Sequence, residues 1–129
     1  MSVSILVVDD EPDVADLFRQ SFRREARQGT YVLHFAYSGE EALDKLAAGI
    51  EPQLTVILSD INMPVMDGLE LLREIKTQRP DLPVMMVTAY GDEERRRLAG
   101  KYGAAEFITK PVDFDLLKTQ LRDLCDAAD

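Results

Sequence analysis

Short runs of apolar residues alternate with segments of helical periodicity along the whole chain. The apolar runs predict five strands, over residues 4–8, 31–36, 54–59, 83–88 and 104–109. Apolar residues at three- and four-residue intervals predict four helices, bounded by Pro12 and Gly29, Ser38 and Gly49, Asp67 and Arg79, and Asp113 and Cys125, and a polar helix is predicted from Asp92 to Lys101. Ser38, Asp67, Asp92 and Asp113 are expected to cap the starts of their helices. Strands that alternate with helices predict an α/β domain in which helices cover both faces of a parallel sheet.

The most apolar runs identify the centre of this sheet. Strands one, three and four are almost entirely apolar, which is typical of strands buried on both faces. The second strand carries Tyr31 and His34 and is therefore expected at an edge. We expect the flavodoxin-like strand order 2-1-3-4-5 in a three-layer sandwich, with a crevice between strands one and three.

Four of the predicted strands run directly into a chemically active polar side chain. Asp9 and Asp10 follow the first strand, Asp60 follows the third, Thr88 ends the fourth and Lys110 follows the fifth. Because the carboxyl ends of parallel strands lie along one edge of a sheet, we expect these side chains to converge. Each alone has a plainer explanation, as a helix cap, a strand residue or a solvated charge. Those explanations account poorly for four complementary strand ends.

The predicted cluster has a chemistry suited to a phosphoryl group. Three carboxylates at one site repel one another unless a cation or a raised pKa offsets the repulsion. Oxygen ligands with few carboxylates favour Mg²⁺, for which Mn²⁺ could substitute. The Lys110 amine and the Thr88 hydroxyl suit anionic oxygens. Asp60, a lone aspartate after a central strand, is the candidate to become an acyl phosphate.

The composition limits the class of partner and the location. The 129 residues fit one domain over 1–129, with an ordered core near 3–125 and a short C-terminal tail. A net charge of −9 disfavours nucleic-acid binding, and no apolar segment approaches the length of a membrane span. The single cysteine excludes an internal disulfide and suits a reducing compartment, so we expect a cytoplasmic protein.

Four motifs give the chain a clear resemblance to the receiver domains of two-component response regulators. They are Val-Asp-Asp-Glu at 8–11, Leu-Ser-Asp-Ile-Asn-Met-Pro-Val-Met-Asp-Gly at 58–68, Val-Thr-Ala-Tyr at 87–90 and Ile-Thr-Lys-Pro at 108–111. Their order and spacing are those of the family, and the resemblance covers essentially the whole chain. It implies a phosphorelay switch that promotes only its own phosphorylation and dephosphorylation, and not an enzyme.

The resemblance assigns a role to each acidic residue of the cluster. It implies that a sensor histidine kinase or a histidine phosphotransfer protein phosphorylates Asp60. Mg²⁺ would be bound by Asp10, Asp60 and the main-chain carbonyl of Asn62, and Asp9 would contribute through water. These residues would form the metal-dependent part of the site.

The resemblance also implies how phosphorylation is sensed. Thr88 and Lys110 would contact the phosphoryl oxygens, and the Lys110–Pro111 peptide would be cis. Thr88 would move toward the phosphoryl group, and Phe107 would turn inward behind it. Many family members have Tyr at this position, and Phe lacks the hydroxyl, so packing alone would carry this step. The plain alternative for Phe107 is a strand-core aromatic.

Two further regions have expected roles. Asn62, Ala89 and Tyr90 would flank the site, and we hypothesise that the bulky Tyr90 screens the acyl phosphate and lengthens its life. In the family, the fourth helix, fifth strand and fifth helix form the output face, used for a homodimer or a downstream effector. The exposed arginine run at 95–97 would join such a contact, or would simply be solvated.

Two other functions use related chemistry or the same topology. A haloacid-dehalogenase-like phosphohydrolase also forms an aspartyl phosphate, but it often has an acid/base Asp two residues after the nucleophile, where this chain has Asn62. The chain also lacks an insert that would select a substrate. A flavin mononucleotide module needs a hydroxyl- and glycine-rich phosphate loop after the first strand, whereas residues 9–13 are strongly acidic.

Overall fold

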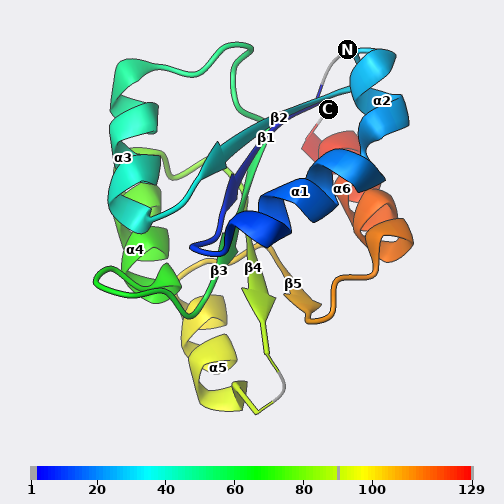
Figure 1. Cartoon of the computed structure of the whole chain (residues 1–129). Helices are drawn as coiled ribbons and strands as arrows, with labels where there is room; N and C mark the ends of the chain where they lie inside the picture. The colour runs from blue at the N-terminus through cyan, green and yellow to red at the C-terminus, as the bar shows by residue number, and fades with distance from the viewer. Residues whose placement is uncertain (1–2, 90, 129) are drawn as a thin grey trace.

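Five parallel strands form a sheet in the order β2-β1-β3-β4-β5 in the computed structural model, which describes residues 3–89 and 91–128 (Figure 1). The strands are β1 (Val3–Val8), β2 (Tyr31–Ala36), β3 (Val56–Asp60), β4 (Val84–Thr88) and β5 (Glu106–Thr109). The helices are α1 (Pro12–Ser21), α2 (Arg23–Arg27), α3 (Gly39–Ala48), α4 (Gly68–Gln78), α5 (Glu93–Lys101) and α6 (Phe114–Ala128). The predicted strand order and the edge position of β2 are therefore confirmed.

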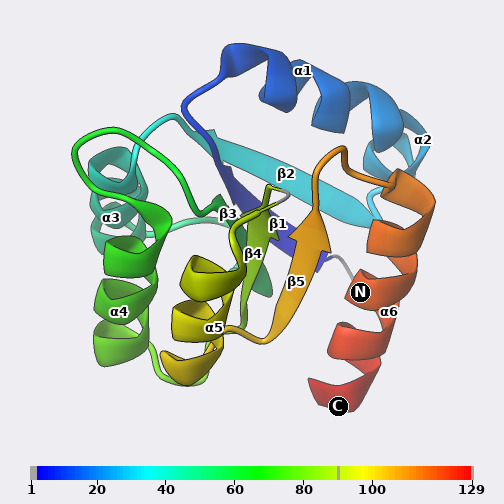
Figure 2. The same ribbon diagram turned by 90° about the horizontal axis from the view of Figure 1, so that it is seen from below.

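Helices cover both faces of the sheet and complete the three predicted layers (Figure 2). On one face, α3, α4 and α5 pack through a core cluster that includes Leu46 and Leu72. On the other face, α1 and α6 pack through a second cluster that includes Phe18 and Leu117, and Phe22, between α1 and α2, belongs to the same cluster. Successive side chains of a strand point to opposite faces, so each short apolar run supplies both clusters. None of the described helices has the length and apolarity needed to cross a membrane.

The strand register aligns the functional ends of the sheet. Val8 of β1 lies level with Ser59 of β3, so Asp9 follows at the level of Asp60. Asp60 in turn lies level with Val87, and Thr88 lies level with Thr109. The polar residues at these strand ends therefore form one row along the carboxyl edge of the sheet.

Side-chain caps begin three of the helices as the sequence predicted. The side chains of Ser38, Asp67 and Asp113 each accept a hydrogen bond, at 3.0–3.1 Å, from the main-chain N–H three residues further on. Caps of this kind contribute about 1 kcal/mol each to helix stability. They fix where α3, α4 and α6 leave the loops that follow the sheet.

Gly68 brings the start of α4 directly against the site strand. A Cβ atom at this position would lie 2.3 Å from the Asp60 carbonyl oxygen and 2.7 Å from the Ile61 Cα. The Gly68 N–H donates a hydrogen bond to the Ile61 carbonyl at 2.9 Å. Only glycine allows this close approach of helix and strand backbones.

The first predicted helix is divided into α1 and α2 at Phe22, where φ is −105° and ψ is 15°. The Phe22 side chain at this division is completely buried, with its ring centroid 5.3 Å from that of Tyr31. Hydrogen bonds from Phe22 to Phe18 and from Ala26 to Phe22 keep a nearly helical path. The apolar spacing is therefore unbroken, and the sequence pattern gives no sign of the division.

Six element boundaries differ from the predicted ones. β1 begins at Val3, β3 begins at Val56 and ends at Asp60, β4 begins at Val84, β5 begins at Glu106, and α6 continues to Ala128. Leu54 shows the reason for the later start of β3, because it is only 9% exposed although it lies outside the strand ladder. Apolar residues pack into the core on either side of a strand end, so apolarity alone does not mark where the ladder begins.

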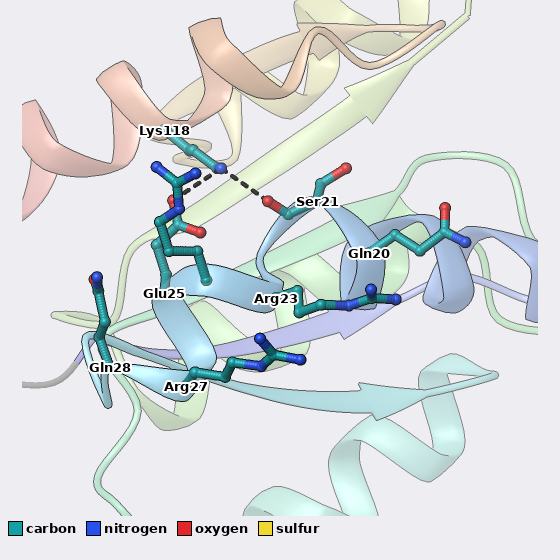
Figure 3. A pocket seen from close by; sticks show the side chains of 8 residues that line it. Gln20, Ser21, Arg23, Glu25, Arg27, Gln28 and Lys118 are labelled. Carbon is teal, nitrogen blue, oxygen red and sulfur yellow. Dashed lines mark hydrogen bonds and ion pairs between the residues drawn. The ribbon is translucent and has the colours of Figure 1, made fainter.

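A polar contact ties α6 to the junction of α1 and α2 (Figure 3). The Lys118 Nζ lies 2.8 Å from a Glu25 carboxylate oxygen and donates to the Ser21 carbonyl, also at 2.8 Å. The Glu25 and Lys118 side chains are 20% and 24% exposed, so the pair is partly shielded from water. A cavity of about 670 Å³ opens beside this pair and is lined by residues of α1 and α2 together with Gln28 and Lys118.

Candidate functional site

The predicted carboxylates converge at the carboxyl edge of the sheet. Asp9 follows β1 and Asp60 is the last residue of β3, and carboxylate oxygens of Asp9, Asp10 and Asp60 lie within 4.8 Å of one another. Asp9 and Asp60 are only 6% and 4% exposed. Three carboxylates from two strand ends therefore share one small volume.

Main-chain N–H groups orient two of these carboxylates. One Asp9 oxygen accepts from the Glu11 N–H at 2.9 Å, and one Asp60 oxygen accepts from the Asn62 N–H at 3.2 Å. Both bonds span two residues and close local turns after the strand. The turns hold the side chains at the strand ends and leave other carboxylate oxygens directed into the cluster.

Lys110 supplies the positive charge of the site from the end of β5. Its Nζ lies 3.0 Å from the second Asp60 carboxylate oxygen, and the Lys110–Pro111 peptide is cis. Burial lowers the pKa of Lys110, but the hydrogen bond and charge of Asp60 outweigh it, so the pKa is raised overall. Lys110 therefore stays protonated beside the carboxylates.

Asp9 has a raised pKa. Burial is the main cause, the neighbouring Asp60 and Asp10 carboxylates contribute less, and the pKa of Asp9 is raised overall to about 6. The Glu11 N–H and Lys110 oppose this increase only in part. A bound cation would favour the charged form of such a carboxylate and would therefore be stabilised in this cluster.

The donor set fits a hard divalent cation. Mg²⁺ prefers oxygen ligands and is typically held by one or two carboxylates together with water. Asp10 and Asp60 offer such oxygens within the cluster, and the main-chain carbonyl of Asn62 lies in the same turn as the Asp60 side chain. The residues present are thus of the right kind for the predicted Mg²⁺ site.

An apolar cavity of about 370 Å³ adjoins the cluster. Its lining includes Asp9, Asp60 and Lys110 together with apolar side chains of α1 and of the segment after β5. Leu17 belongs to the apolar periodicity of the first predicted helix, yet it lines this cavity and is 52% exposed. The site is therefore bordered by apolar surface on its α1 side.

The two predicted switch residues lie on adjacent strands. Thr88 is 2% exposed, and its hydroxyl donates weakly to the Ile108 carbonyl at 3.4 Å. Phe107 is half-buried, and the Arg96 guanidinium lies 4.8 Å from its ring centroid. A small cavity of about 140 Å³ lies between Thr88 and Arg96. The structure thus places space and a cation–π contact around the predicted switch.

The arginine run at 95–97 does not form one exposed cluster. Arg95 turns inward to Asp67 at 2.8 Å, Arg96 stacks on Phe107, and Arg97 pairs with Glu94 of its own helix. Three consecutive residues of a helix point in three directions, so their side chains meet different neighbours. The predicted exposure of the whole run is wrong for Arg95, whose side chain is 34% exposed.

Asp92 also differs from its predicted role as a side-chain cap of the fourth helix. It occupies the N-cap position of α5, but among the described residues its side chain makes no capping hydrogen bond. One Asp92 carboxylate oxygen instead accepts from the Asn62 side-chain amide at 2.8 Å and from the Ala89 N–H at 3.2 Å. A helix-start aspartate looks the same in sequence whichever N–H group it binds.

The predicted flanking residues are only partly described. Asn62 and Ala89 are exposed and border the cluster through their contacts with Asp60 and Asp92. Tyr90, the third predicted flanking residue, lies outside the described residues.

This fold and the arrangement at its strand ends define the class of receiver domains. The chain matches the family model of the response regulator receiver domain over residues 5–122, and it belongs to that family. The family places the chain in two-component signalling, in which receiver domains interact with kinases and output domains.

Relatives of known name support this assignment. The chain is 38% identical over 125 residues to the response regulator MprA of Mycobacterium bovis, covering 96% of this chain and 51% of that protein. It is 37% identical over 121 residues to the transcriptional regulatory protein ZraR of Klebsiella oxytoca, covering 94% of this chain and 26% of that protein. The chain thus spans about half or less of these relatives.

Solved structures agree with the fold. A response regulator receiver domain protein from Clostridium thermocellum superposes with a TM-score of 0.87 at 28% identity, covering 98% of this chain and 96% of that one. The receiver domain of NtrX from Brucella abortus superposes with a TM-score of 0.82 at 33% identity, covering 95% and 98% of the two chains.

Proposed function

We propose that this receiver domain accepts a phosphoryl group on Asp60 from a sensor histidine kinase or a histidine phosphotransfer protein. The observation that carries the proposal is the cluster of three carboxylates within 4.8 Å, with Lys110 at 3.0 Å from Asp60. Phosphoryl transfer is promoted mainly by positioning the nucleophile and by placing positive charge near the phosphoryl oxygens.

Each residue of the site has a defined part in this step. A carboxylate oxygen of Asp60 attacks the phosphorus of the phosphohistidine, the P–N bond breaks, and the imidazole leaves with the bonding electron pair. Lys110 is already paired with Asp60 and would follow the negative charge onto the phosphoryl oxygens. The Thr88 hydroxyl, at present bonded weakly to β5, would exchange that bond for a phosphoryl oxygen.

A divalent cation would complete the charge balance. Asp10, Asp60 and the main-chain carbonyl of Asn62 would hold Mg²⁺, with Asp9 acting through water. The bound cation would offset the charge that the carboxylates and the phosphoryl group bring together. The raised pKa of Asp9 is compatible with this proposal, because burial and, to a smaller extent, the Asp60 and Asp10 carboxylates disfavour its charged form when no cation is bound.

The proposed readout uses the face formed by α5, β5 and α6, which correspond to the fourth predicted helix, the fifth strand and the fifth predicted helix. Movement of Thr88 would open space on its β5 side, and Phe107 would turn into it and leave Arg96. This change would alter the surface presented to a second copy of the chain, to a separate effector or to an output domain. Phe107 and Arg96 belong to the two elements that meet there, which supports the proposal.

Intact mass measurement tests the central step. The protein is incubated with Mg²⁺ and acetyl phosphate, and we expect a mass gain of one phosphoryl group. Asp60→Ala should abolish the gain, whereas Asp44→Ala, which removes an exposed aspartate from α3, should leave it unchanged. An unmodified wild-type mass, or an equal gain in the Asp60 variant, would contradict the proposed function.

A further inference from the structure

The first turn of α5 is bonded to the loop that follows Asp60. Asp92 binds the Asn62 side-chain amide at 2.8 Å, and Arg95 binds the Ile61 carbonyl at 3.2 Å and the Asp67 carboxylate at 2.8 Å. One turn of helix thus holds both ends of the segment 61–67 with side chains of opposite charge. Asp67 is also the cap of α4, so the arrangement links the starts of two helices to the end of β3.

The two N–H groups that Asp92 binds also border the proposed phosphoacceptor. Asn62 donates its main-chain N–H to Asp60 at 3.2 Å while its side-chain amide donates to Asp92. The Ala89 N–H lies at the end of β4, two residues beyond Val87, which is level with Asp60. Both donors therefore lie beside the position that a phosphoryl group on Asp60 would take, and both are hydrogen-bonded to the Asp92 carboxylate.

We propose that Asp92 is a positioning residue that acts as an internal substitute for the phosphoryl group in the unphosphorylated domain. The inference rests on the proposed function of Asp60. The Asp92 carboxylate holds the N–H donors of Asn62 and Ala89 in place beside the site. A phosphoryl group on Asp60 competes for the same donors and repels Asp92, because it adds up to about two negative charges and three acceptor oxygens.

Displacement of Asp92 changes the start of α5. The side chain already lies at the N-cap position, where a carboxylate readily accepts from the unpaired N–H groups of the first turn. Once it leaves Asn62 and Ala89, it becomes the cap that the sequence predicts. Phosphorylation then reaches α5 through its first turn, separately from the movement of Thr88 and Phe107.

Measurements on the unphosphorylated protein test the first half of the inference. We expect Asp92→Ala to shift the ¹⁵N NMR signals of the Ala89 amide and of the Asn62 side-chain amide, since both lose their acceptor. Asp92→Asn, which keeps an acceptor oxygen without the charge, should give smaller shifts. Glu93→Gln removes the same charge from the next position and should leave both signals in place.

Phosphorylation kinetics test the second half. With acetyl phosphate and Mg²⁺, we expect Asp92→Ala to be phosphorylated about threefold to tenfold faster than wild type. This size is expected because the variant lacks one charged group that competes with the phosphoryl group for its hydrogen-bond donors at a partly exposed site. Asp92→Asn should fall between the two. Glu93→Gln should stay within about twofold of wild type, because the effect belongs to the contacts and not to the total charge.

The outcomes separate this inference from the proposed function. An unphosphorylated wild type contradicts the function of Asp60 and the inference with it. If wild type is phosphorylated and Asp92→Ala reacts at the same rate, the inference alone is overturned, whether or not the NMR signals move. Equal acceleration in Glu93→Gln also overturns it, since total charge would then explain the result.

Discussion

Two helical glycines differ in the space around them, so the same substitution to alanine can be compared in a crowded and in an open position. Gly68 at the start of α4 has main-chain atoms of Asp60 and Ile61 within 2.7 Å of where a Cβ would lie. Because backbone cannot yield as a side chain can, Gly68→Ala should lower the free energy of unfolding by about 2 kcal/mol or more. Urea denaturation measures this change, and the same variant should accept phosphoryl groups more slowly, since α4 would displace the Asp60 backbone.

Gly100 in α5 is the control for this substitution. A Cβ there would meet only the Phe107 ring, at 3.8 Å, which is ordinary van der Waals contact. Gly100→Ala should therefore raise the free energy of unfolding by up to about 1 kcal/mol through helix propensity. A loss of stability in Gly100→Ala equal to that in Gly68→Ala would contradict the steric argument.

Val65 is a second residue whose conformation conflicts with its side chain. Its φ is 66° and its side chain is 89% exposed, so a β-branched residue adopts the left-handed region without gaining burial. Asn tolerates this region better, and Val65→Asn should raise the free energy of unfolding by about 1 kcal/mol. Thermal or urea denaturation measures it. Val65→Thr keeps the β-branch and should leave stability unchanged, and a gain there equal to that of Asn would refute the strain argument.

At this scale, some site residues could be predicted and others could not. The convergence of Asp9, Asp60 and Lys110 follows from the strand ends alone, because parallel strands share one carboxyl edge. The contacts of Asp92 and Arg95 do not follow from the sequence. Their partners lie about 30 residues away on another loop, and an acidic helix start or a run of arginines has no local feature that identifies a tertiary partner.

Among the elements, α6 depends on an ion pair with the α1–α2 junction. The hydrogen bond from Lys118, opposed by burial, lowers the pKa of Glu25 below its ordinary value of 4.5. The unfolded chain therefore binds a proton at higher pH than the folded chain does. The pair's contribution to stability is present above about pH 4.5 and is lost as the pH falls through the folded-state pKa.

The pair predicts how stability depends on pH. Glu25→Gln should lower the free energy of unfolding by about 1 kcal/mol near pH 7 and by less at about pH 3.5, because below the unfolded-state pKa the unfolded wild type takes up a proton and part of the pair's contribution is lost. Urea denaturation at both pH values measures the difference. Asp16→Asn breaks the exposed pair of Asp16 with Arg19, whose side chains are 70% and 52% exposed, and should change stability little at either pH. An equal effect of Glu25→Gln at both pH values would show that charge plays no part.

The order of the elements could be predicted more fully than their ends. Alternating apolar periods and the caps at Ser38, Asp67 and Asp113 identify the strands and helices, and the strand order follows from which runs are most apolar. The break at Phe22 and the start of β3 depend instead on packing from both sides of the sheet. Periodicity within one segment does not contain that information.

For the molecule as a whole, the clustered carboxylates predict that Mg²⁺ stabilises the folded state. A ligand that binds only the folded protein adds about 1.4 kcal/mol at ten times its Kd. Thermal unfolding should therefore shift to higher temperature when Mg²⁺ replaces EDTA. Asp10→Asn should lose most of the shift, and Asp13→Asn, an exposed change in α1, should keep it. A shift of equal size in both variants would mean that Mg²⁺ acts elsewhere.

The two core clusters on opposite faces of the sheet also have a consequence for how the molecule can change over time. The cluster under α3, α4 and α5 and the cluster under α1 and α6 involve different side chains of the same strands. Substitutions in separate clusters are expected to act additively on stability where their sites lie more than about 10 Å apart. One face can therefore accumulate sequence changes, and with them a new set of partners, while the other keeps its own. The sheet edge between them retains its chemistry throughout.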